Sequence, residues 1–87
     1  MKAVITVIGK DMVGILAKVS TTCAEANANV SEVTQPIMDE YFAMIMLVEI
    51  DKMNCTLDEL KNSIEKIVPT MTVHVMHEDI FNSMHRI

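Results

Sequence analysis

The chain is poor in the residues from which many functional sites are built. Its 87 residues include two glycines, two prolines, two cysteines, one tyrosine, two phenylalanines and no tryptophan. Acidic residues outnumber basic residues by twelve to seven, which gives a net charge of −5, and the basic residues are spread along the chain. Because this pattern offers no basic patch to a phosphate backbone, direct nucleic-acid binding is not expected.

Membrane insertion is not expected either, because no segment approaches the roughly 20 apolar residues of a membrane helix. The stretch between Lys2 and Gly9 is too short for the apolar core of a signal peptide. Cys23 and Cys55 lack the spacing of a metal site or a disulfide framework, so both are expected to be reduced thiols. These features favour a cytoplasmic protein.

Apolar residues, by contrast, are in excess. They make up 51% of a chain that is long enough for a single core, and this is more than a small monomer needs to fill its interior. We therefore expect some apolar surface to be covered by a second subunit, and a homodimer is the predicted assembly.

Both glycines lie in one short segment, residues 9–15, between a predicted strand and a predicted helix. The preceding residues 4–8 are β-branched, whereas helical spacing follows in Ile15, Val19, Cys23 and Ala26. The helix is predicted from about Met12 to Asn27, where an asparagine can adopt the left-handed conformation.

The same segment is a candidate anion site. Asp11 is predicted to be the N-cap that accepts from the N–H of Gly14, and Gly14 leaves the first helical turn without a side chain. The free N–H groups and the positive end of the helix dipole favour a carboxylate at such a terminus. Glycines in such loops also serve loop geometry alone, and this alternative stays open.

The middle of the chain predicts two strands. Residues 30–38 form the first, and Pro36 requires that it lie at a sheet edge or contain a bulge, because proline cannot donate a hydrogen bond. Tyr41–Ile50 is almost continuously apolar, which is typical of a central strand covered on both faces.

A second helix and a last strand follow. Thr56 and Glu59 form a capping box, and Pro69 ends the helix that begins there. Residues 71–76 alternate as a strand. The predicted fold is therefore α+β and ferredoxin-like, βαββαβ, with a four-stranded antiparallel sheet and two helices on one face.

The carboxy-terminal residues 79–87 are predicted to form a short helix that follows a domain of residues 1–78. Asp79 is its expected N-cap, and its apolar face consists of Ile80, Phe81, Met84 and Ile87. The sheet face without the two helices must then be covered by this tail helix, by a second subunit or by both. We favour both.

No catalytic constellation is found in the sequence. Ser20, Thr21 and Thr22 have no base at reachable spacing, and His74 and His77 are predicted to point to opposite faces of a strand. We therefore expect no enzyme activity, no cofactor and no metal site.

The sequence resembles the ACT domain family over essentially its whole length. The resemblance is carried by the loop and helix of residues 9–19, by Asn29-Val30 and by Tyr41–Ile50. Within the family, the closer likeness is to the small stand-alone ACT proteins of bacteria and archaea and to the ACT modules of the glycine cleavage system transcriptional repressor family. The resemblance implies a regulatory, commonly dimeric module that binds an amino acid or a related metabolite.

It also implies a ligand site between the loop of one subunit and the second strand of its neighbour. Asp11 would face the ligand amine, backbone N–H groups of Met12, Val13 and Gly14 would hold the carboxylate, and Asn29 would add its amide. An interaction or assembly module without a small-molecule ligand is the alternative. Only the first hypothesis requires Asp11 and Asn29 to converge.

Overall fold

The computed structural model describes residues 1–10, 14–38 and 40–84. Its elements are, in chain order, β1 (Lys2–Gly9), α1 (Ile15–Glu25), β2 (Asn29–Thr34), β3 (Ile37–Met38), β4 (Tyr41–Glu49), α2 (Leu57–Ile67), β5 (Thr72–His77) and α3 (Glu78–Met84).

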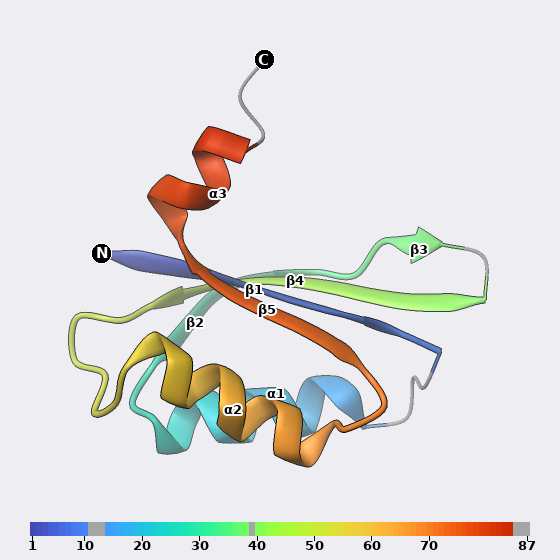
Figure 1. Ribbon diagram of the computed structural model, residues 1–87, viewed down its shortest axis with the longest axis horizontal. Helices are drawn as coiled ribbons and strands as arrows, with labels where there is room; N and C mark the ends of the chain where they lie inside the picture. Colours follow the sequence, from blue (N-terminus) through green and yellow to red (C-terminus); the bar gives the residue numbers. More distant parts are fainter. Residues whose placement is uncertain (11–13, 39, 85–87) are drawn as a thin grey trace.

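The four long strands form an antiparallel sheet in the order β2-β4-β1-β5, and the two-residue β3 also pairs with β4. Helices α1 and α2 cover one face of this sheet, and α3 lies on the opposite side (Figure 1). The predicted ferredoxin-like fold is confirmed. No helix in the described part of the chain is long and apolar enough to cross a membrane.

The core lies between the sheet and the helices α1 and α2. Alternate residues of β1 and β4 point into it, and the largest fully buried side chains include Ile5, Ile15, Met44, Met46, Leu60 and Ile64. Each side chain of this size contributes about 1.5–3 kcal/mol when it is fully buried. This single core positions both ends of α1, where the candidate site residues lie.

Helix α1 begins later than predicted. Its first residue is Ile15, and its N-cap residue is Gly14, which has a φ of 71°. The predicted start near Met12 is therefore too early, because the chain enters the helix through a left-handed conformation that glycine adopts without steric cost. Asp11, the predicted N-cap, lies outside the described residues. The other end agrees with the prediction, since Asn27 has a φ of 61°.

Pro36 divides the predicted strand of residues 30–38 into β2 and β3. β2 lies at the edge of the sheet, and its register with β4 shifts between Val30 and Glu32. Both predicted alternatives, the edge position and the bulge, are confirmed. The division follows from the missing N–H of proline, which cannot continue the ladder.

The second helix forms as its capping box predicts. Thr56 Oγ1 accepts from the N–H of Glu59 at 3.1 Å, and Glu59 Oε1 accepts from the N–H of Thr56 at 3.0 Å. The helix ends at Ile67, two residues before Pro69.

The tail helix α3 begins at Glu78, directly after β5, so Asp79 is not its N-cap. Instead, the N–H of Asp79 donates to Nδ1 of His77 at 3.2 Å. The histidine at the strand end therefore takes the capping role, which the sequence pattern had assigned to the nearest carboxylate. Ile80, predicted to be on the apolar face, has 56% of its surface exposed.

The face of the sheet opposite α1 and α2, called the outer face below, is covered only in part. Val4 is 4% exposed, and α3 contacts β1 and β5. Ile8, Tyr41 and Ile45 lie on the same face and are 41%, 44% and 38% exposed. Within one chain, α3 therefore supplies only part of the predicted cover, and cover by a second subunit stays a prediction.

Candidate functional site

Gly14 lies at the amino-terminal end of α1. Among the described residues, a Cβ added at Gly14 would meet Lys18 alone, whose Cε would lie 4.0 Å from it. The carbonyl of Gly14 accepts from the N–H of Lys18 at 3.0 Å, so the first N–H groups of α1 have no partner within this helix. Of the predicted ligand residues, Asp11, Met12 and Val13 lie outside the described residues.

Asn29 begins β2, at the other end of α1. Its Nδ2 donates to Oε2 of Glu49 across the strand pair at 3.4 Å, and the side chain is exposed. This bond leaves Oδ1 of Asn29 and the other carboxylate oxygen of Glu49 as acceptors. Glu49 was not among the predicted site residues, because its pairing with Asn29 depends on a strand register that the sequence does not specify.

Two hollows meet at Asn29. One, of about 390 Å³, is lined by Ser20, Ala24, Asn27, Ala28, Asn29 and Val30. The other, of about 300 Å³, is lined by Asn27, Asn29, Glu49, Asp51 and Lys52. The second hollow joins carboxylates, amides and an ammonium group, so its lining suits a small polar molecule better than an apolar one.

Gly14 and Asn29 do not converge within one chain. Helix α1 has 11 residues, which corresponds to about 16 Å, and it separates the two (Figure 1). The strand register gives the same separation of the two regions. Gly9 pairs with Phe42 at one end of β4, and Asn29 pairs with Glu49 at the other end, roughly 23 Å away. A site that contains both the Gly14 end and Asn29 needs two chains.

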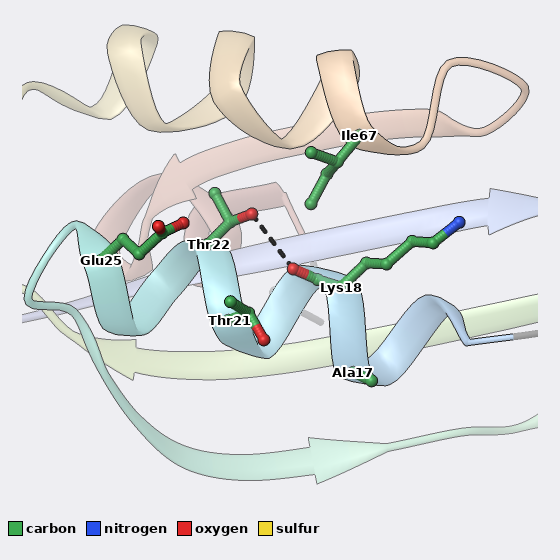
Figure 2. Close-up of a pocket in the computed structure, with 6 residues that line it drawn as sticks. All are labelled: Ala17, Lys18, Thr21, Thr22, Glu25 and Ile67. Atoms are coloured by element: carbon green, nitrogen blue, oxygen red, sulfur yellow. Dashed lines mark hydrogen bonds between the residues drawn. The ribbon is translucent and has the colours of Figure 1, made fainter.

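A further hollow, of about 450 Å³, lies between α1 and α2 and is lined by Ala17, Lys18, Thr21, Thr22, Glu25 and Ile67. Figure 2 shows that Thr22 Oγ1 donates to the carbonyl of Lys18, at 3.1 Å, on its own helix. This hollow contains none of the residues predicted to bind a ligand. The only charged groups of its lining, Lys18 and Glu25, are exposed.

The two thiols are poor nucleophiles. Burial raises the pKa of Cys23 to about 11, and burial together with the nearby carboxylate of Glu59 raises the pKa of Cys55. Both are therefore protonated at neutral pH. Across residues 1–10, 14–38 and 40–84, no group of three His, Cys, Asp or Glu side chains has the arrangement of a metal site.

Comparison with known proteins places this geometry in a family. Residues 2–78 match the ACT domain family. The chain is 47% identical over 88 residues to a UPF0237 protein of Methanocaldococcus jannaschii, covering 99% of this chain and 98% of the relative. It is also 34% identical to the solved structure of an ACT domain protein from Streptococcus pneumoniae, with a TM-score of 0.77 and 93% of each chain covered.

The fold extends to more distant proteins. A solved structure described as a putative glycine cleavage system transcriptional repressor has a TM-score of 0.71 at 14% identity, with 85% of this chain and 44% of that chain covered. At this identity the likeness shows the fold alone. The family match over most of the chain, together with the relative at 47% identity, shows that the chain belongs to the ACT domain family.

Proposed function

We propose that this chain is a non-enzymatic, cytoplasmic regulatory module that binds an amino acid or a related small metabolite at a homodimer interface. The observation that carries the proposal is the placement of two polar half-sites at opposite ends of α1. Neither half-site is complete alone. In a dimer of two antiparallel copies, the Gly14 end of α1 in one chain meets the Asn29 half-site of the other chain, so two complete sites form.

The edge strand β2 indicates how two copies meet. Antiparallel pairing of β2 with β2 around a two-fold axis brings Asn29 of the partner subunit to the Thr34 end of this strand. That is the side on which β1 ends and α1 begins. Leu16 and Val33 are both 38% exposed and add apolar area near this edge. An edge strand also offers unpaired backbone groups to such a pairing.

The chemistry of the two halves is complementary to a zwitterion. The first N–H groups of α1 and the positive end of its dipole suit a carboxylate. Asn29 Oδ1 and the free oxygen of Glu49 are acceptors that suit an ammonium group. Asp11 would face the same amine, with backbone N–H groups of Met12 and Val13 beside that of Gly14.

Regulation follows from the shared site. A ligand that contacts both chains binds the dimer and not the monomer, so it stabilises the dimer by mass action. Ligand concentration is thereby converted into a change in association.

Thermal unfolding against a panel of amino acids tests the proposal. A ligand at 100 times its dissociation constant stabilises the fold by about 2.7 kcal/mol, which raises the Tm by roughly 10–20 °C for a domain of this size. Asn29→Ala should abolish the shift, whereas Thr21→Ala in the hollow between α1 and α2 should retain it.

The alternative is an assembly module without a small-molecule ligand. The exposed apolar groups at the β2 edge and on the outer face favour it, because they explain association by themselves. If no amino acid raises the Tm of a protein that sedimentation shows to be dimeric, the assembly module is the better conclusion. A monomer without a ligand contradicts both.

A further inference from the structure

The outer face is divided into a covered half and a bare half. The covered half lies where β5 ends, near the pairing of Ala3 with His77, and includes the buried Val4. The bare half lies at the other end of the strands and includes Ile8 and Tyr41. An apolar surface in the middle of a sheet is normally covered.

Helix α3 cannot cover the bare half of its own sheet. It begins at Glu78, immediately after the last residue of β5, so no linker allows it to move along the strands. Ile8 lies five residues along β1 from Ala3, which corresponds to roughly 16 Å. Figure 1 shows α3 rising from this end and away from the sheet. Its residue Ile80 is 56% exposed.

We propose that two copies pack their outer faces together around a two-fold axis, so that α3 of each copy lies on the bare half of the other. A two-fold axis that lies between the sheets and runs perpendicular to the strands exchanges the strand ends, and therefore places each α3 where the partner has none. Ile80 then packs on Ile8 and its neighbours in the partner subunit. Each chain gives one helix and receives one.

Charge favours a second copy as the occupant. The net charge of −5 opposes association in general, but the described outer-face residues of β1 and β4 in the bare half, Thr6, Ile8, Ala43 and Ile45, are uncharged. The register places the outer-face charges of Lys2, Glu32 and Glu49 toward the other end of the strands. Asp79 at the start of α3 has an 84% exposed side chain, and Lys10 at the bare end has a 67% exposed one. The two-fold axis brings these opposite charges together twice.

Lys10 already pairs with Glu40, so in this contact its ammonium group is shared between Glu40 and the partner's Asp79. Its Nζ lies 3.5 Å from Glu40 Oε1 and 5.6 Å from the centroid of the Tyr41 ring. The ring and Lys10 therefore lie on the outer-face side of the loop, next to the position proposed for the partner's α3.

The proposed exchange of α3 does not depend on the ligand site or on the β2 edge. The edge and the outer face are different surfaces, so both interfaces can form in the same assembly. Two perpendicular two-fold axes then produce a tetramer of four chains, whereas the face interface alone produces a dimer.

Cross-linking between two differently tagged chains tests the exchange of α3. One chain carries Ile80→Cys and the other Ile8→Cys, both with Cys55→Ser, while the buried Cys23 is retained. After mixing and mild oxidation, a disulfide-linked pair with one chain of each tag is expected. The matched control replaces Ile8→Cys by Asp58→Cys on the exposed face of α2. A yield no higher than that of the control would overturn the proposal.

The same cross-link in a Val33→Lys background separates this interface from the β2 edge. The proposal requires the cross-link to persist when the edge is blocked, and its loss there would assign the contact to the edge instead.

Charge reversal gives a second readout. Lys10→Glu and Asp79→Lys should each weaken association roughly two- to fivefold, and the double variant should restore it. Additive weakening in the double variant would contradict the pairing.

Discussion

Met71 packs directly against the backbone of Gly9, so that a Cβ at residue 9 would overlap the Met71 sulfur. The two glycines of the loop therefore have different causes. Gly9 leaves room for a buried side chain from the chain segment between α2 and β5. Gly14 provides a left-handed turn and faces open space. Of the two, only Gly14 is available to a ligand.

Gly9→Ala should destabilise the fold by about 1 kcal/mol, because the added methyl displaces the flexible end of the buried Met71 side chain. The free energy of unfolding in urea measures this loss. In a Met71→Ala background the same substitution has room, so its cost should fall well below 1 kcal/mol. An equal cost in both backgrounds would place the strain elsewhere.

The stability of Gly14 variants should depend on how well the new residue tolerates a positive φ, and not on its helix propensity. Gly14→Ala is expected to lose about 1–2 kcal/mol of unfolding free energy, and Gly14→Asn less, because asparagine tolerates the left-handed region. Gly14→Val should be the most destabilising, since a β-branched residue is strained there. Urea unfolding of the three variants gives the order. A stability that follows helix propensity, with Ala the best, would contradict it.

The elements that the sequence predicted correctly each have a local cause. The capping box of Thr56 and Glu59, the left-handed Asn27 and the interruption at Pro36 depend on backbone chemistry within a few residues. The errors arise where two local solutions compete. A carboxylate at residue 79 and an imidazole at residue 77 can both accept from the first turn of α3, and only the strand end determines that His77 does so.

The sequence named candidate site residues but did not give their geometry. The loop pattern pointed to Gly14, and the resemblance to the ACT domain family pointed to Asn29. The sequence did not indicate that α1 holds them about 16 Å apart, because that depends on how the helix lies across the sheet. Nor did it identify Glu49 as the partner of Asn29, because a one-residue change of register would remove that pairing.

Alkaline pH should weaken the fold through Cys23. Its pKa is about 11 in the folded chain, against an ordinary value of 9.0. The unfolded chain therefore releases this proton first, so stability is full below pH 9 and falls as the pH rises toward 11. The loss amounts to about 2–3 kcal/mol. Urea unfolding between pH 8 and 11 measures it.

Other groups also titrate in this range, so the comparison is made with Cys23→Ala, both proteins carrying Cys55→Ser. The variant starts from a lower stability because of the cavity it creates, about 1–2 kcal/mol for the lost sulfur. Its further decline with pH should be smaller than that of the parent. Parallel declines would show that Cys23 does not drive the pH dependence.

Complementation between two defective chains tests whether the ligand site is shared. Gly14→Asn adds a side chain where a carboxylate needs bare backbone, while retaining a residue that tolerates the left-handed turn. Asn29→Ala removes the amide on the other half-site. Each homodimer should fail to bind the amino acid that stabilises the parent.

Random exchange of the two chains produces heterodimers with one intact site and one doubly altered site. About a quarter of all sites should then bind, as measured by calorimetry on the mixture. If binding stays absent in a mixture that forms heterodimers, Gly14 and Asn29 do not meet across the interface. If either variant binds alone, the ligand lies elsewhere.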